Sequence, residues 1–409
     1  MNAESLLNEA KELQEQIVTS RRYLHAHPET GFDLDHTVEF VTKELREMGY
    51  EPKRCGKAGV VAMAGGKKPG KVIMLRADMD ALPLPEESGE SFSSEIPGKM
   101  HGCGHDMHTS MLLGAAKLLK AHEDEIEGIV KLDFQPAEEI FEGAYDTIQA
   151  GILKNPDVDA AIMIHVLAGM PMPAGMLLVS PPGIGASACD FFKITVQGKG
   201  CHGSSPYLGV DPINVAAHII ISLQEVQTRE IMVTDKVAMT ICSIHGGATN
   251  NVIPDTVEMT GSLRTYHEEA RAEVKGRMTE IVESVGKTFR AEAKLEFTSG
   301  CPTFMNDADL SAGAVKYARE LLGQQMVIDP SGMQKNENER EMPAGGSEDF
   351  AYVSQEVPSL QLCFSVSKPS PDGKMYPIHN SKVCFDDSVL YKGAAVYAYQ
   401  AMRWLEENK

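Results

Sequence analysis

Four side chains that can bind a metal lie within eight residues, directly before an apolar helical pattern. They are His101, Cys103, His105 and His108, in the segment MHGCGHDMHTSMLLGAAKLL at 100–119. Their types and spacing leave three interpretations open. The segment could form a metal site, it could supply a nucleophilic cysteine with a histidine base, or it could be an ordinary loop.

Further candidate groups follow two predicted strands. Glu138 and Glu139 are adjacent carboxylates at the end of one strand, and His165 closes the apolar strand predicted at 160–166. Neighbouring carboxylates repel each other, so one of them is expected to bind a cation or to keep a proton. Because the ends of parallel strands meet at the edge where α/β proteins place their sites, we expect these groups to converge with Cys103.

These distant groups weigh against the other chemistries. A nucleophilic Cys103 with His105 as its base would leave the paired carboxylates without a role, and no oxyanion-hole motif is evident. A closed structural zinc site usually has four ligands with CxxC-like spacing, which one cysteine and carboxylates fit poorly. The pattern favours a catalytic metal site with an open position for water. Thiolate and imidazole ligands favour borderline metals over magnesium or calcium.

Length and charge limit the classes of protein. A chain of 409 residues exceeds the usual size of one hydrophobic core, so two domains are expected. Asp and Glu total 58 against 38 Lys and Arg, which gives a net charge of -20. Such a charge repels nucleic acid and anionic membrane surfaces, so neither is expected as a partner. A substrate that carries a carboxylate would need a local cationic clamp.

The sequence predicts a cytoplasmic protein with reduced thiols. Its first 18 residues, MNAESLLNEAKELQEQIV, lack the basic and apolar regions of a signal peptide. Apolar stretches such as AAHIIISL, at 216–223, are far shorter than a membrane span. The eight cysteines form no CxxC pair.

Two patterns of elements are expected to position the candidate groups. The first alternates strands and helices, which indicates an α/β domain with a largely parallel sheet covered by helices. Its strands are predicted at 71–79, 128–138 and 160–166, and its helices at 4–19, 36–49, 110–122 and 141–151. The same pattern returns near the C-terminus with a helix at 310–322, a strand at 360–366 and a helix at 388–406.

A different pattern interrupts it near Ala188. The order of strands and helices there is βαββαβ, which is typical of a ferredoxin-like α+β domain. The strand CDFFKITVQG is followed by a helix at 211–227, strands at 237–244 and 256–266, a helix at 268–286 and a strand at 291–300. We therefore predict a metal-binding catalytic domain of residues 1–187 and 302–409, with residues 188–301 inserted as a second domain.

Seven motifs resemble one metallopeptidase family, which contains aminoacylase, carboxypeptidase G and dipeptidases. They are LHAHPETGF (24–32), LRADMDALP (75–83), HGCGHDMHTS (101–110), QPAEE (135–139), GGATNNVIPD (246–255), GSEDFAYV (346–353) and YPIHN (376–380). The resemblance is to the amidohydrolase branch, with its hippurate hydrolases, N-acyl-amino-acid amidohydrolases and plant auxin-conjugate hydrolases. It implies a zinc-peptidase-like catalytic domain whose inserted domain is a lid that dimerises.

The resemblance also implies a ligand set for one or two divalent ions of zinc, manganese, nickel or cobalt: Cys103, His105, Glu139, His165 and His379. It implies that Glu138 is the general base that takes a proton from water. The broader family has a His-x-Asp ligand pair where this chain reads Asp78-Met79-Asp80. The histidine is therefore missing, and Cys103 and His105 are expected to replace it.

In the lid, the resemblance implies that His202 stabilises an oxyanion, in some relatives from the partner subunit. Asn251 and Arg264 match lid positions that hold a substrate carboxylate. The expected reaction is hydrolysis of an N-acyl amino acid to a carboxylic acid and a free amino acid. The alternatives are a metallo-dipeptidase or carboxypeptidase and, outside enzymes, a two-domain protein that binds a small acid without chemistry.

Overall fold

The computed structural model describes residues 2–332 and 346–409. Within them the chain forms two compact units. The first comprises residues 2–185, 305–332 and 352–409, and the second comprises 186–304 and 346–351. The assignment of the units as a catalytic domain and a lid stays a prediction.

An eight-stranded sheet forms the centre of the first unit, in the order β1-β2-β4-β3-β5-β16-β6-β15. The strands are β1 (Lys53–Cys55), β2 (Gly59–Gly65), β3 (Val72–Asp78), β4 (Ile129–Gln135), β5 (Ala160–Leu167), β6 (Leu177–Val179), β15 (Val327–Ile328) and β16 (Ser359–Ser365). The neighbours β4, β3, β5 and β16 are parallel, whereas β1, β2 and β6 add antiparallel pairings. The prediction of a mostly parallel sheet is confirmed. Every residue of β3 is buried, as expected of a strand covered on both faces.

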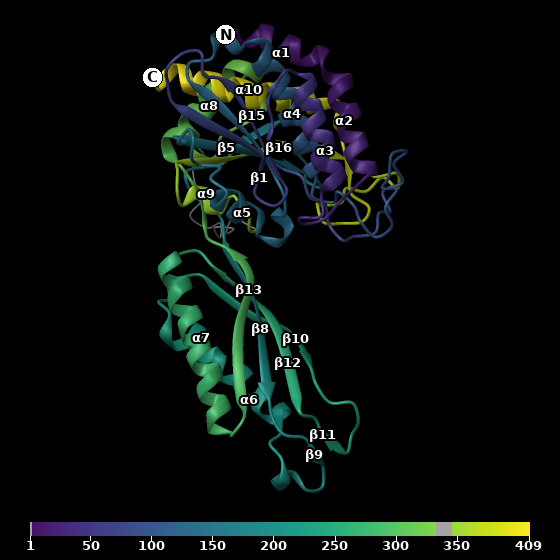
Figure 1. Ribbon diagram of the computed structural model, residues 1–409, viewed down its shortest axis with the longest axis vertical. Coiled ribbons are helices and arrows are strands. Elements are labelled where there is room, and N and C mark those ends of the chain that lie inside the picture. The colour runs from purple at the N-terminus through teal and green to yellow at the C-terminus, as the bar shows by residue number, and fades with distance from the viewer. Residues whose placement is uncertain (1, 333–345) are drawn as a thin grey trace. The chain divides into compact units, whose positions relative to one another are not determined.

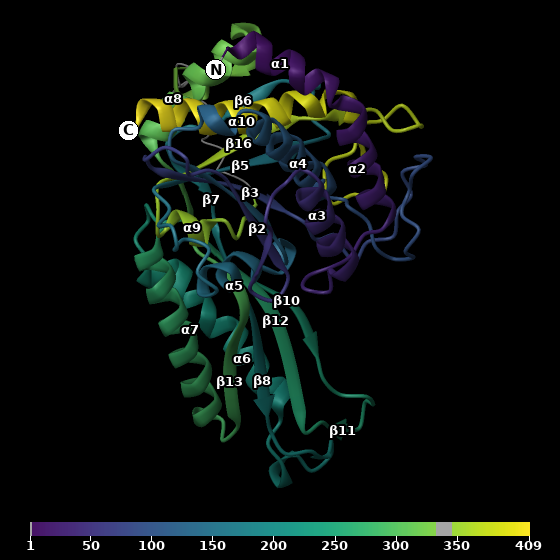
Figure 2. The same cartoon turned by 45° about the horizontal axis from the view of Figure 1, so that its top comes forward.

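Helices pack on this sheet as α/β architecture requires (Figure 1). They are α1 (Ala3–Glu12), α2 (Gln14–Ala26), α3 (Asp35–Glu47), α4 (His105–Ala121), α5 (Gly143–Gln149), α8 (Ala308–Leu322), the short α9 (Ala351–Ser354) and α10 (Leu390–Glu407). Figure 2 shows α4 and α10 side by side, and both contact β3. Almost every residue of α4 is buried, so this helix is a central element of the core.

Two helix predictions are wrong in their bounds. The single helix predicted at 4–19 is two helices, because α1 ends at Glu12 and α2 begins at Gln14. The helix predicted to begin at Ser110 begins at His105, one turn earlier. This second difference matters for function, because it places His105 in the first turn of a rigid, buried helix.

The second unit has the ferredoxin-like order predicted from the sequence. Its antiparallel sheet runs β10-β12-β8-β13. The elements are β8 (Ala188–Gln197), α6 (Pro212–Glu225), β10 (Val237–His245), β12 (Thr256–Thr265), α7 (Glu268–Thr288) and β13 (Glu292–Cys301). Asp211 caps α6 by accepting hydrogen bonds from the amides of Ile213 and Asn214. Both helices share one hydrophobic core with the sheet.

Two short strands form a separate pair in the second unit. They are β9 (Cys201–His202) and β11 (Val252–Ile253), which are antiparallel. Among the described residues, no helix has the length and apolar character needed to cross a membrane.

Candidate metal centre

The candidate site lies where the parallel strands of the first unit end. β3 ends at Asp78, and a short turn of residues Glu138–Ile140 follows the end of β4. His165 lies near the end of β5. Because the carboxyl ends of parallel strands share one edge of a sheet, these groups lie at the same edge.

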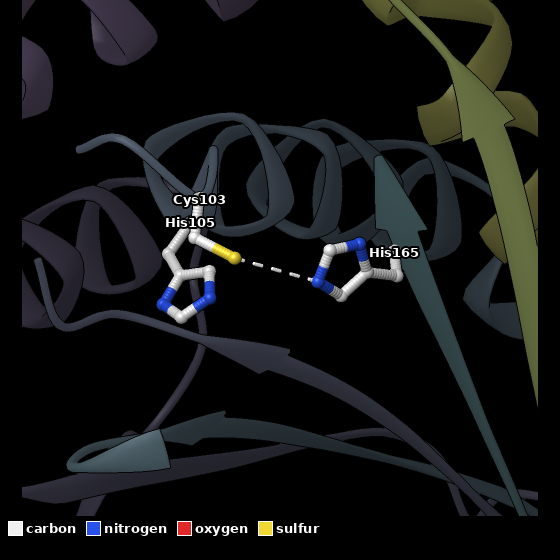
Figure 3. A group of neighbouring side chains, drawn as sticks. All are labelled: Cys103, His105 and His165. Carbon is white, nitrogen blue, oxygen red and sulfur yellow. Dashed lines mark hydrogen bonds between the residues drawn. The ribbon is translucent and has the colours of Figure 1, made fainter. Parts of the chain in front are cut away.

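The structure brings the five candidate ligands together. Potential ligand atoms of Cys103, His105 and His165 lie within 4.8 Å of one another, and so do those of Cys103, Glu139 and His379. Figure 3 shows the Cys103 thiol directed at the His165 ring, with Sγ 3.6 Å from Nε2. Glu139 Oε1 lies 3.6 Å from His379 Nε2 and 3.8 Å from His105 Nε2. Residues from four separate segments therefore form two overlapping groups that share Cys103.

Backbone carbonyls orient two of the histidines. His105 Nδ1 lies 2.8 Å from the carbonyl oxygen of Asp80, and His165 Nδ1 lies 2.7 Å from that of Val166. A carbonyl can only accept, so each Nδ1 carries a proton and donates it. In the neutral ring, each Nε2 then has a lone pair directed at the cluster. This is the usual arrangement of a histidine that binds a metal.

Two of the four residues in the opening segment have other surroundings. His108 Nδ1 lies 2.5 Å from Asp78 Oδ1, and His108 Nε2 accepts a hydrogen bond from the Val166 amide at 2.9 Å. Both nitrogens of this ring are therefore occupied, which makes His108 a structural residue. His101 is buried, and it belongs to none of the groups of neighbouring ligand atoms among the described residues. Burial lowers its pKa to about 3.

Asp80 holds the turn that carries the two glutamates, a role that the sequence did not reveal. Its Oδ1 accepts a hydrogen bond from the Glu138 amide at 2.9 Å, and its Oδ2 accepts one from the Glu139 amide at 3.2 Å. Its carbonyl also orients His105. The sequence marked Asp80 only as part of the segment Asp78-Met79-Asp80.

The same turn has strained backbone on both sides. Ala137 has a φ of 55° and Phe141 a φ of 57°, both in the left-handed region that disfavours residues with a Cβ. Such conformations cost on the order of 1–3 kcal/mol each and cluster at functional sites. The fold therefore holds the Glu138–Glu139 pair in one defined conformation.

The ionisation of the cluster reflects its burial. Burial raises the pKa of Glu139 to about 7, a shift that His105 opposes and Asp80 reinforces. Burial also raises the pKa of the Cys103 thiol well above its usual range and lowers the pKa of His165 to about 3. Protonated thiol and carboxyl ligands release their protons when a cation binds.

The donor set fits a divalent transition metal. Two of its atoms, His105 Nε2 and Glu139 Oε1, are buried without a hydrogen-bond partner among the described residues. One thiol and three imidazoles, together with one carboxylate, suit zinc, manganese, nickel or cobalt better than magnesium or calcium. Glu138 lies beside this set, with Oε2 3.9 Å from His105 Nε2.

The three remaining predicted residues belong to the second unit. His202 is exposed in β9, and the adjacent Gly203 amide donates to the carbonyl of Asn251 at 2.8 Å. The Ser204 amide donates to His202 Nδ1 at 3.1 Å, so in the neutral ring the proton of His202 is on Nε2. His202 and Asn251 therefore lie together.

Arg264 lies on β12, in the four-stranded sheet of the second unit. It is eight residues beyond Thr256, which begins β12, a separation of ~27 Å at about 3.4 Å per residue. Its guanidinium donates to the Ser347 hydroxyl. Within the second unit, the structure does not bring Arg264 together with His202 and Asn251.

Comparisons with known proteins identify relatives along almost the whole chain. N-acetyl-L-cysteine deacetylase of Bacillus subtilis (strain 168) is 35% identical over 398 residues, which cover 97% of this chain and 90% of the relative. Thermostable carboxypeptidase 2 of Saccharolobus solfataricus is 35% identical over 406 residues, 98% of each chain.

A solved structure agrees with these relatives. It is the crystal structure of a dinuclear metal-binding peptidase of the M20 family from Bacillus subtilis. Its TM-score to this chain is 0.75 at 30% identity, and the match covers 97% of this chain and 99% of that one. Residues 74–403 match the family described as Peptidase family M20/M25/M40. The resemblance seen in the motifs is confirmed. The chain is a hydrolase and belongs to peptidase family M20/M25/M40.

Proposed function

We propose that this protein is a metal-dependent amidohydrolase that cleaves N-acyl amino acids into a carboxylic acid and a free amino acid. The observation that carries the proposal is that Cys103, His105, Glu139, His165 and His379 form two overlapping groups of ligand atoms that share Cys103, with the Glu138 carboxylate beside them. The hydrolase family to which the chain belongs gives no support to a protein that only binds a small acid.

These five residues would hold one or two divalent ions. A bound ion of this kind makes water more acidic and polarises a carbonyl oxygen. A count of two is supported by the M20 relative from Bacillus subtilis, which is described as dinuclear. The identity of the metal is to be measured.

Glu138 is the proposed general base. Its carboxylate is largely buried, and its backbone amide is held by Asp80, so its position is fixed by the fold. It takes a proton from the attacking water and then gives it to the nitrogen that leaves. Proton transfer by a positioned side chain contributes about 10²–10⁴ in rate.

We propose that two copies of the chain contribute to one substrate site. One copy supplies Arg264, and the other supplies His202 and Asn251. The distance between the two ends of β12 is too long for one small substrate to contact all three residues. β10 is an edge strand with exposed apolar side chains such as Ile244, and it could pair with a second copy. Full activity in a protein that light scattering shows to be monomeric would contradict this assignment.

The proposed substrate class is supported by one relative, the deacetylase of N-acetyl-L-cysteine. The carboxypeptidase relative supports the alternative, cleavage of peptides. A panel of N-acetyl amino acids, hippurate and dipeptides separates the two. We expect turnover to vanish when a chelator strips the protein and to return with one or more divalent ions. Turnover that chelators do not affect would contradict the proposal.

Asp80→Asn tests how the glutamate turn is positioned. Asp80 now accepts hydrogen bonds from two backbone amides. An asparagine has only one carbonyl oxygen, and its side-chain amide group would face one of these two donors. We expect divalent-ion affinity and kcat to fall by about 10–100-fold, the usual loss when a residue that supports metal ligands is changed. Binding is measured by chelator competition and kcat by steady-state kinetics.

A matched control is Asp159→Asn. Asp159 also accepts a hydrogen bond from a backbone amide, that of Val72 at 2.8 Å, but at the opposite end of β3. Replacement of Asp159 should leave divalent-ion affinity and kcat within about twofold of the values for the original protein, because Asp159 contacts none of the ligand-bearing segments. Equal losses in the two variants would show that Asp80 affects stability alone.

A further inference from the structure

A buried group of charged side chains lies behind the first turn of α4. We name it the His25 cluster, and it consists of Arg21, His25, Glu86 and Asp106. The four side chains are at most 3% exposed. Burial of so many charges is costly unless each is paired, so their contacts must be specific.

His25 bridges two carboxylates from different parts of the chain. Its Nδ1 lies 2.8 Å from Asp106 Oδ2 and its Nε2 lies 3.1 Å from Glu86 Oε1. Arg21 Nε lies 2.8 Å from the same oxygen of Asp106. Burial and the Arg21 guanidinium lower the pKa of His25, but the two carboxylates outweigh them, so its pKa is raised. Each ring nitrogen faces a carboxylate oxygen, an arrangement that suits a ring donating from both nitrogens.

The first turn of α4 is tied to α2 through Asp106, which contacts both His25 and Arg21. No side chain caps the turn, and its N-terminal residue, Gly104, has a φ of 92°. A Cβ at Gly104 would lie 2.5 Å from Val166 Cγ2, so only glycine fits this close approach. Cys103 and His105 flank this glycine. Asp106 is the next side chain, and it ties the turn to α2 through His25.

The second contact of His25, with Glu86, leads to the segment that carries His379. Glu86 Oε2 accepts a hydrogen bond from the Ser94 amide at 2.7 Å, which fixes the loop around it. The neighbouring Glu87 amide donates to the carbonyl of Ser381 at 2.7 Å. The His379 amide in turn donates to the carbonyl of Gly102 at 2.8 Å. Both contacts of His25 therefore lead to segments that carry candidate ligands.

We propose that His25 is a positioning residue for the metal centre, since its bridge from Asp106 to Glu86 sets the spacing between the Cys103–His105 turn and the His379 loop. The inference rests on the proposed function, because it assumes that these residues bind the metal. His25 itself touches neither a candidate ligand nor the substrate. Its effect is transmitted through Asp106 and Glu86.

His25→Gln is the test, with Zn²⁺ or Mn²⁺ alone as the probe. Glutamine lacks the ring of His25, whose two N–H groups point at two different carboxylates, so it cannot bridge them in the same way. We expect divalent-ion affinity, measured by chelator competition well below the unfolding temperature, to fall by about 10-fold or more. The kcat of the fully loaded enzyme should fall while KM stays within about twofold.

His122→Gln is the matched control. His122 lies at the other end of α4 and also bridges two carboxylates, with Nε2 2.6 Å from Glu9 and Nδ1 2.8 Å from Glu125. Its loss removes the same kind of contact without reaching a ligand-bearing segment. The control should therefore bind the ion as the original protein does, even where its melting temperature is lower.

Each outcome separates the possible explanations. A lower melting temperature with unchanged ion affinity in His25→Gln would overturn the inference, because the cluster would then be only structural. If His25→Gln does not fold, Glu86→Gln takes its place and should also weaken ion binding. Unchanged ion affinity in Glu86→Gln would overturn the inference as well. An original protein that binds no divalent ion would refute the proposed function itself, and the inference with it.

Discussion

Glu138→Gln is expected to remove nearly all turnover and to leave divalent-ion binding intact. The amide has almost the same shape as the carboxylate but cannot take a proton from water. Loss of a general base lowers the rate by about 10²–10⁴. The backbone contacts that hold the turn should survive, because Asp80 binds the amide of residue 138 and not its side chain.

The measurements are kcat and KM on an N-acetyl amino acid and the metal content of the purified variant. KM should change little, since the proposed base acts in the chemical step. Glu142→Gln is the matched control, because Glu142 lies just beyond the same turn and is exposed. Near-normal turnover in Glu138→Gln would show that another group is the base. A simultaneous loss of metal would instead place Glu138 among the ligands.

Some parts of this site could be predicted because they depend on short-range patterns. Strands that alternate with helices imply a parallel sheet, and parallel strands end at one edge. The approach of His165 and the glutamate pair to Cys103 follows from that rule, since the glutamates come after β4 and His165 lies near the end of β5. The βαββαβ order of the second unit was predictable for the same reason.

Other parts depend on contacts between residues far apart in the chain. The sequence gives no sign that Asp80 holds the amides of residues 138 and 139, or that His25 bridges Asp106 and Glu86. It also could not separate His108 from His105, since the difference lies in distant partners: His105 Nδ1 donates to the Asp80 carbonyl, whereas His108 Nε2 accepts from the Val166 amide.

The resemblance did not reveal how far apart two of the predicted residues lie in the second unit. Asn251 and Arg264 are 13 residues apart and both matched positions expected to hold one carboxylate. Most of that interval is the extended strand β12, which separates its two ends by its full length. The start of α4 was missed because Gly104 and the histidines around it are poor helix formers, and burial rather than propensity decides that turn.

Cys103→Ala is expected to abolish tight divalent-ion binding, and turnover with it. The thiol takes part in two of the overlapping groups of ligand atoms, one with His105 and His165 and the other with Glu139 and His379. Its removal should therefore weaken binding by more than the about 10–100-fold typical of a supporting residue. Chelator competition measures the affinity. Cys55→Ala is the control for the loss of a buried thiol, because Cys55 contacts the Thr147 carbonyl and no candidate ligand.

The same variant decides between metal chemistry and a cysteine nucleophile. The 3.6 Å approach of Cys103 to His165 has the form of a thiol and its base, but the electrostatics oppose that role. A reactive cysteine needs a lowered pKa, whereas burial raises the pKa of Cys103 and lowers that of His165. A nucleophile would resist chelators, and its alanine variant would still bind metal. If Cys103→Ala keeps its metal and loses only turnover, the thiol attacks the substrate and the ligand set must be redrawn without it.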